Sequence, residues 1–344
     1  MATLPVPSAL PVLLALILLA CSPADTELRI LSYNVHNFFD DVHDGTEFAG
    51  YRPGIDLWSS ADFHTKAERT AAAIRLAAEP TADPISVPKW GARLLTATGF
   101  APSLWPDVLL LQEIENEHAL AVLLGDHLGR AGYRWSLMPP PSGSAFRVAA
   151  ATRFPIRSAR THALFFLDAP QRDILEVELE VEGVSLTLFV NHWPSRRGGV
   201  VESEPARLFS AATVSRRIGR LLETDPRAAA VVAGDLNMTP EELHAAGILP
   251  LLNGWELNGV PGSYFFRGEW SRIDQMLFTS GAVDGPFTLL GFEAISHPRL
   301  RDREGRPLPW RSGSSWGSSD HLPVQARLRL PAGAITAPTR RPPP

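Results

Sequence analysis

The stretch AAAVVAGDLNMTPEEL, residues 228–243, joins an apolar strand to the start of a helix through a polar tip. The apolar residues that lead to Gly234 are typical of a buried strand. Asp235 and Asn237 follow at the point where this strand ends. Thr239, with Glu242 three residues later, is the pattern of a helix N-cap with a capping box. The stretch therefore predicts a strand that presents polar side chains at its end and continues into a helix.

The same organisation extends on both sides of this stretch, with apolar strands and amphipathic helices in alternation. We expect strands at 28–35, 106–116, 147–156, 173–181, 184–191, 271–278 and 318–330, and helices at 63–78, 118–128 and 204–222. The segment 81–105 is punctuated by proline and glycine and is expected to be an irregular insertion.

Polar residues recur at the ends or edges of these apolar strands. They are Asn34, Glu113, Asn191, His192, Asp235, Asn237, Asp274, Asp320 and His321. A single Asp or Asn at a strand end is ordinarily a turn former, so no one of them indicates a site by itself. If the strands share a sheet edge, however, all of these side chains converge, and the set then predicts a catalytic site.

The full set of motifs resembles the endonuclease/exonuclease/phosphatase superfamily. The likeness is carried by SYNVHNFFD, PDVLLLQEIEN, VNHWPSRRGG, VAGDLN, SRIDQMLF and SSDHLPV and extends from about residue 28 to 330. The combination with NHWPSRRGG looks most like bacterial exported members of nuclease type. This resemblance implies an α/β fold, a four-layer sandwich of two packed mixed sheets with helices outside. His36 stands where many relatives have an acidic residue, so a further carboxylate on the metal does not carry over.

The resemblance also implies roles for the site residues. Glu113 is expected to be the main ligand of Mg²⁺, with Mn²⁺ or Ca²⁺ as alternatives, and Asn34 and Asp320 are its neighbours directly or through water. Asp274 is expected to orient His321. Two arrangements are open: either His321 is the base for the attacking water, or Asp235 is the base and His321 is a protonated phosphate clamp.

The stretch NHWPSRRGG supplies the remaining candidates. Asn191 is expected to donate to a phosphate oxygen, and His192 to be a second acid/base partner or a phosphate donor. Arg196 and Arg197 are candidate substrate contacts, because their planar guanidinium groups suit a phosphate, although a solvated loop is the alternative. Asn237 is expected to hold the water together with Asp235.

Composition limits the partners of the chain. The 344 residues are 45% hydrophobic and 20% charged, which is typical of a globular protein. A net charge of -5 gives no support for a protein that coats nucleic acid or membrane through bulk charge. An anionic substrate must therefore be held by a local site or a metal. We expect a monomeric phosphodiesterase acting on nucleic acid, with a phospholipid or phosphorylated small molecule as the alternative substrate and a non-catalytic surface lipoprotein as a third reading.

The two ends of the chain are expected to lie outside the catalytic domain. Residues 10–20 form an apolar run of signal-peptide length, and Cys21 follows in a sequence that resembles a bacterial lipobox. The sequence predicts a signal peptide at 1–20, the superfamily domain at 21–330 and a disordered proline-rich tail at 331–344. Export to the cell envelope or outer membrane on a lipid attached to Cys21, or secretion, is the expected destination.

Overall fold

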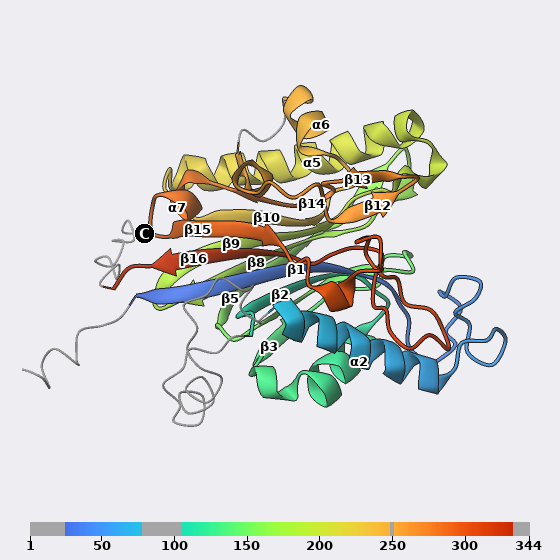
Figure 1. Ribbon diagram of the computed structural model, residues 1–344. Coiled ribbons are helices and arrows are strands. Elements are labelled where there is room, and N and C mark those ends of the chain that lie inside the picture. Colours follow the sequence, from blue (N-terminus) through green and yellow to red (C-terminus); the bar gives the residue numbers. More distant parts are fainter. Residues whose placement is uncertain (1–24, 78–104, 248–250, 333–344) are drawn as a thin grey trace, which may run out of the picture.

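Figure 1 shows the computed structural model, which describes residues 25–77, 105–247 and 251–332. The expected signal peptide with Cys21, nearly all of the 81–105 insertion and most of the 331–344 tail lie outside these ranges. Within them, none of the helices combines the length and the apolarity needed to cross a membrane.

Two sheets of six strands each form the centre of the molecule. The first sheet contains, in spatial order, β15 (Thr288–Ala294), β16 (Val324–Leu330), β1 (Thr26–Phe38), β2 (Val108–Ile114), β4 (Arg147–Thr152) and β3 (Trp135–Leu137). The second contains β11 (Leu252–Asn253), β14 (Asp274–Phe278), β10 (Ala230–Asp235), β9 (Val184–His192), β8 (Ile174–Val181) and β5 (Ile156–His162). Both sheets are mixed, because β1 with β2 and β9 with β10 are parallel pairs among antiparallel neighbours.

Short hairpins and helices surround the sheets. The hairpins are β6 (Phe165–Phe166) with β7 (Ala169–Pro170), and β12 (Tyr264–Phe266) with β13 (Glu269–Ser271). The α-helices are α2 (Ser60–Ala77), α4 (Glu117–Val122), α5 (Val200–Thr224), α6 (Pro240–Ala245) and α7 (Ser280–Val283). A π-helical turn η1 (Leu123–His127) continues α4, and short 3₁₀ turns are η2 (Gly129–Ala131), η3 (Arg196–Gly198), η4 (Gly254–Leu257) and η5 (Pro298–Leu300).

Three hydrophobic clusters hold the layers together. One lies between the sheets, and side chains of β1, such as Leu28 and Ile30, meet those of β8 and β9 there. Leu31 points to the opposite face of the first sheet and joins the cluster beneath α2, because successive strand residues alternate between faces. The third cluster packs α5 on the outer face of the second sheet. The resulting order, α2, sheet, sheet, α5, is visible in Figure 1 and confirms the expected four-layer sandwich.

Several expected elements have different bounds in the structure. The expected strand 318–330 begins only at Val324, so Asp320 and His321 precede it, and the expected helix 118–128 is α4 followed by the π-helical turn η1. The segment 147–156 is not one strand: β4 ends at Thr152, and β5 begins at Ile156 in the other sheet, after Pro155. Helix α5 begins at Val200 rather than at residue 204, so Pro205 lies inside it. The capping box at Thr239 is confirmed, since its side chain and that of Glu242 each accept a backbone N–H of the other.

Candidate active site

The polar strand ends converge because of the sheet topology. The parallel strands β1 and β2 bring their carboxyl ends together, and so do β9 and β10 in the facing sheet. Strands β14 and β16 are antiparallel to these neighbours, so the site takes Asp274 from the first residue of β14 and Asp320 and His321 from the segment that leads into β16. A cleft of about 1120 Å³ opens at this shared edge. Its lining includes Glu113, His192, Asp235, Asn237, Asp320 and His321.

Paired irregularities in β1 and β2 shape one wall of the cleft. The register of the pair slips between Asn34 and Phe38, and His36, Asn37 and Glu113 all have positive φ angles, of 55°, 53° and 64°. This conformation is uncommon for residues with a Cβ and costs on the order of 1 kcal/mol or more each. It places the backbone nitrogen of Asn37 2.7 Å from Glu113 Oε2, and the Asn37 N–H donates a hydrogen bond to that oxygen. The strained backbone therefore holds the Glu113 carboxylate in one orientation.

Asn34 links carboxylates from both sheets. Its Nδ2 donates to Glu113 Oε1 at 3.1 Å and to Asp235 Oδ2 at 3.0 Å. Its Oδ1 accepts the backbone N–H of His36, which fixes the orientation of the amide. Asn34 is completely buried and does not line the cleft. In this arrangement Asn34 positions the two carboxylates.

His321 forms a buried dyad with Asp274. His321 Nδ1 donates to Asp274 Oδ2 at 2.8 Å, and Ser263 Oγ donates to the same oxygen at 2.6 Å. Burial by itself would lower the pKa of His321, but the charge and hydrogen bond of Asp274, with Asp320 and Asp235, raise it to about 10. The imidazole is therefore held in its protonated form near neutral pH.

Asp235 lies between the two histidines of the site. Its Oδ2 is 3.6 Å from His192 Nε2 and 4.0 Å from His321 Nε2. Burial raises the pKa of Asp235 to about 7, with repulsion from Asp274 in the same direction and the charge of His321 opposing it. A carboxyl with this pKa exchanges a proton readily at neutral pH.

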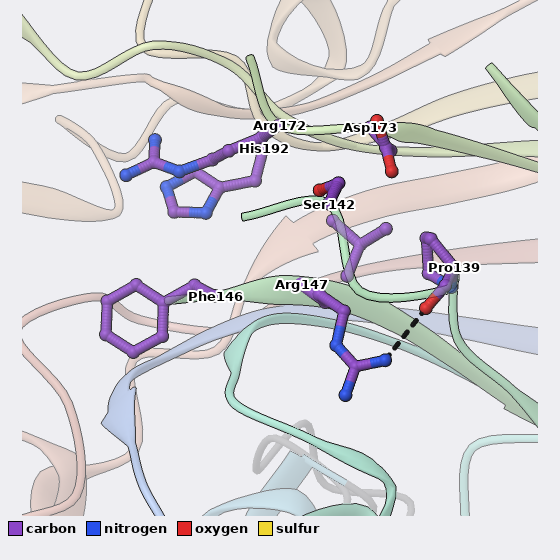
Figure 2. A pocket seen from close by; sticks show the side chains of 8 residues that line it. Pro139, Ser142, Phe146, Arg147, Arg172, Asp173 and His192 are labelled. Carbon is purple, nitrogen blue, oxygen red and sulfur yellow. Dashed lines mark hydrogen bonds between the residues drawn. The ribbon is translucent and has the colours of Figure 1, made fainter. Parts of the chain in front are cut away.

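The pKa of His192 is shifted in the opposite direction from that of His321. Burial lowers its pKa well below the ordinary value, and the positive charges of Arg172 and His321 lower it further. Among the described residues its Nδ1 has no hydrogen-bond partner, while Nε2 faces Asp235 and Glu113. Figure 2 shows the narrow space behind the ring, with Arg172 beside His192 and Phe146 across from it. His192 is therefore neutral near pH 7.

Asn191 is not brought into the cleft. Its Nδ2 donates to the carbonyls of Phe189 and Ala233, and its Oδ1 accepts from Trp193 Nε1. The expected contact with a phosphate is therefore not supported by the placement of this side chain, which ties β9 to β10. Gly234 lies opposite, and a Cβ on it would be 1.9 Å from the Asn191 carbonyl oxygen, which explains the glycine in GDLN.

The two arginines of NHWPSRRGG differ in their surroundings. Arg196 donates from Nε to the Asn237 carbonyl at 2.9 Å and forms an ion pair with Glu242 of α6. Arg197 is exposed and lines the cleft, and no ion pair of its guanidinium is found among the described residues. Asn237 lines the cleft too, and its Nδ2 donates to the Trp193 carbonyl at 3.0 Å. Arg197 is thus the one better placed to contact a substrate.

Oxygen donors suited to a divalent cation gather on the first-sheet side of the cleft. Glu113 and Asp320 both line it, and Asp320 Oδ1 accepts no hydrogen bond among the described residues although it is buried. His36 Nδ1 lies 3.5 Å and His321 Nε2 3.9 Å from this oxygen, and a buried carboxylate oxygen that accepts no hydrogen bond fits a hard cation such as Mg²⁺. Asp235, Asp274 and His321 also lie within ligand distance of one another. The hydrogen bond between Asp274 and His321 occupies this second group, so Glu113 and Asp320 are the better candidates to hold a cation.

Two charged residues of the site carry no recognisable sequence signal. Arg172 lines the cleft beside His192 and donates to the Trp193 carbonyl at 2.9 Å, but it precedes β8 in an irregular segment. Lys66 of α2 is 1% exposed, and its Nζ donates to the carbonyls of Val35 and Ser318 next to the cleft-lining segments. On a helix, a lysine is ordinarily read as part of the solvated face.

Comparison with known proteins identifies the class that this fold and site define. Residues 92–329 match the model of the Endonuclease/Exonuclease/phosphatase family, and the chain belongs to that family. No curated protein matches the sequence.

Several solved structures are similar. Truncated TDP2 from Caenorhabditis elegans has 16% identity and a TM-score of 0.56, with 88% of this chain and 97% of that chain covered. A family protein from Bacteroides thetaiotaomicron has 16% identity and a TM-score of 0.55, covering 89% and 98%. Danio rerio TDP2 complexed with single strand DNA product has 16% identity and a TM-score of 0.51, covering 88% and 99%. At these identities the likeness establishes the fold.

Proposed function

We propose that the protein is an exported, divalent-metal-dependent phosphodiesterase that hydrolyses nucleic acid. The observation that carries the proposal is the position of Asp235 Oδ2 between the Nε2 atoms of His192 and His321, at the floor of a cleft with Glu113 and Asp320 on one wall. Hydrolysis of a phosphodiester needs an activated water, neutralised phosphate oxygens and a stabilised leaving oxygen. The site has groups for the first two requirements, and solvent water supplies the proton that the leaving oxygen takes up.

Asp235 is the base in this mechanism, and His321 is a phosphate clamp. The ionised Asp235 takes a proton from water, whose oxygen then attacks phosphorus as the bond to the leaving oxygen breaks, and the alkoxide that leaves takes a proton from solvent water. The protonated His321 donates from Nε2 to a phosphate oxygen, while Asp274 keeps the proton on Nδ1. Of the two arrangements that the sequence leaves open, the raised pKa values of Asp235 and His321 favour this one.

His192 acts as a neutral donor to the phosphate. A histidine whose pKa is held far below neutrality is a poor reservoir of protons for a leaving oxygen. Its Nε2 faces the centre of the site, and in the tautomer that carries the proton on this atom it can donate to a phosphate oxygen. The half-buried Arg172 beside it adds positive charge on the same side of the cleft.

Glu113 and Asp320 would hold the cation, with Asn34 as the residue that positions Glu113. The chemistry that a divalent ion supplies at such a place is neutralisation of the negative charge on phosphate oxygens. Mg²⁺ is the expected ion, because the available donors are carboxylate oxygens.

The lining of the cleft supports nucleic acid as the substrate. Arg172, Arg197 and Arg267 bring local positive charge to a protein of negative net charge, and Tyr264 and Phe266 add aromatic faces. Arginine and aromatic side chains together are the usual means of holding a polynucleotide. The related fold of Danio rerio TDP2, in complex with single strand DNA product, accommodates such a ligand.

A phospholipid is the second candidate substrate. Val200 lines the cleft and, together with Val201 at the start of α5, is exposed to solvent. An apolar rim of this kind is what a lipid-hydrolysing enzyme needs at a membrane surface. Attachment of a lipid to Cys21, which we propose as the membrane anchor of the mature protein, is compatible with either substrate.

A substrate panel tests the proposal. Purified protein is assayed on single-stranded DNA, supercoiled DNA, RNA, sphingomyelin and inositol phosphates, with Mg²⁺, Mn²⁺ or Ca²⁺ and with excess chelator. We expect hydrolysis of nucleic acid that depends on the metal ion. Hydrolysis of sphingomyelin alone would favour the second candidate, and no hydrolysis of any substrate would favour the non-catalytic reading.

A further inference from the structure

A series of aromatic rings leads from the catalytic histidine to the surface. The Tyr264 ring stacks on the imidazole of His321, with centroids 4.6 Å apart and planes at 29°. The Phe266 ring follows, 6.1 Å from Tyr264 and within 16° of parallel. Tyr264 and Phe266 share a face of hairpin β12–β13, because they are two residues apart on one strand. The rings therefore present parallel faces along the cleft.

The last ring of the series is exposed. Phe266 has 57% of its surface accessible, although it lines the same cleft as the candidate catalytic residues. The residues on the other face of the hairpin, Phe265 and Trp270, pack on each other at 5.4 Å and leave Phe266 outside that contact. Phe266 thus contributes little to the hydrophobic core.

A positive charge accompanies the exposed ring. The guanidinium carbon of Arg267 lies 5.3 Å from the centroid of Phe266, and the side chain is solvent-exposed. Arg267 also lines the cleft, as Arg197 does. An aromatic face with arginines beside it is complementary to a nucleotide, which has a flat base and a negative phosphate.

We propose that Phe266 is a stacking subsite for an unpaired nucleobase next to the phosphodiester held at His321, and that Arg267 contacts the phosphate of that nucleotide. This inference rests on the proposed function and narrows its substrate to single-stranded nucleic acid. In a duplex the neighbouring base pairs cover both faces of each base, so only an unpaired base can stack on the ring.

The geometry favours a base over a lipid chain. Acyl chains need a contiguous apolar surface and have no preference for parallel planes, whereas a base extends a series of nearly parallel rings. The guanidinium of Arg267 next to the Phe266 ring and the hydroxyl group of Tyr264 are polar, which suits a nucleotide better than a hydrocarbon chain. Because every base has a π-face, the subsite is expected to tolerate any sequence.

The test compares substrates with and without bases. We would measure kcat/KM for a short oligothymidylate and for an oligonucleotide of the same length in which every base is missing. In Phe266→Ala, kcat/KM for the oligothymidylate should fall about 5- to 150-fold, the range that loss of one stacked base produces. Hydrolysis of the base-free strand should be unchanged, and Phe266→Trp should retain the wild-type preference.

Phe165→Ala is the matched control. Phe165 is 63% exposed on the two-stranded hairpin β6–β7 and does not line the cleft. This variant should hydrolyse both strands as the wild type does. Single base-free positions placed along the oligothymidylate should then locate the position at which the wild type, but not Phe266→Ala, detects the missing base.

The outcomes distinguish a failure of the stacking subsite from a failure of the proposed function. Equal loss in Phe266→Ala on both strands, or no loss on either, would overturn the subsite while wild-type hydrolysis still supports the enzyme. Weaker binding of Phe266→Ala to phosphatidylcholine vesicles with unchanged oligothymidylate hydrolysis would make the ring a membrane contact and also overturn it. Absence of nucleic acid hydrolysis in the wild type would instead contradict the proposed function.

Discussion

Replacement of Lys66 by methionine tests what the buried amine of Lys66 contributes to the stability of the fold next to the active site. Lys66 is one of only two lysines in the chain, the other being Lys89. Its Nζ donates to the Val35 carbonyl at 2.7 Å and to the Ser318 carbonyl, and so joins the end of β1 to the segment before Asp320. Methionine fills a similar volume but leaves both carbonyls without this donor. A buried group that loses its partner costs about 1–3 kcal/mol, so the variant should be about 2–6 kcal/mol less stable where the amine is neutral.

The pH dependence of this loss is the sharper prediction. Burial lowers the pKa of Lys66 from 10.5 to about 7, against the charges of Asp320 and Glu113. Between these two pH values the unfolded chain binds a proton at Lys66 and the folded protein does not. Folding stability from this group is therefore complete above 10.5 and is lost as pH falls to about 7, with a slope of about 1.4 kcal/mol per pH unit. Methionine does not titrate, so the deficit of the variant should be about 2 kcal/mol larger at pH 9 than at pH 7.

Urea unfolding of both proteins in chelator at the two pH values measures this difference. Arg75→Met, which removes an exposed cation from the same helix, should leave stability nearly unchanged at both. Lysine-selective NMR gives the titration of Lys66 directly, since the only other signal belongs to Lys89. A deficit that is equal at pH 7 and pH 9, or an Nζ that titrates near 10.5, would refute the reasoning.

Three further changes probe the site and the anchor. Glu113→Gln should weaken Mg²⁺ binding, measured by calorimetry, by at least the roughly 10- to 100-fold that changes around a metal site cost, and unchanged affinity would move the metal elsewhere. His192→Ala should slow hydrolysis of a natural diester and of a nitrophenyl diester by similar factors, because a neutral donor acts on the phosphate. A loss confined to the natural diester would identify His192 as the acid for the leaving oxygen. Cys21→Ala should shift the protein from the membrane fraction to a soluble one, and an unchanged distribution would contradict the lipid anchor.

Much of the fold follows from local sequence pattern. Strand ends that carry Asp235 and Glu113 are visible because an apolar run stops at a polar residue, and the capping box at Thr239 marks the next helix. The sequence pattern does not show which side chains of a strand face the cleft. Asn191 and His192 are neighbours on β9, and the period of two sends them to opposite faces, but sequence alone does not say which of the two faces the cleft.

Charged residues that depend on tertiary partners were equally beyond the sequence. Arg196 is held by Glu242, which lies on a different helix, and this pairing separates its role from that of the adjacent Arg197. Lys66 and Arg172 lie at places where a solvated side chain is the ordinary expectation. The packing of α2 buries Lys66, and the segment before β8 leaves Arg172 half-buried against the Trp193 carbonyl. The ion pairs and the burial of these charged side chains depend on how the helices and sheets pack together, and the spacing of residues in the sequence does not reveal them.

Hydrolysis of a single-stranded oligonucleotide as a function of Mg²⁺ tests the central claim most directly. The wild-type protein should cleave it with a saturable dependence on Mg²⁺ and should lose this activity in excess chelator. His321→Ala should bind Mg²⁺ as the wild type does and cleave on the order of 100-fold or more slowly, because removal of one oriented donor to the developing charge costs that much. Undiminished cleavage by the wild type in chelator, or by His321→Ala in Mg²⁺, would contradict the assignment of this cleft as a metal-dependent phosphodiesterase site.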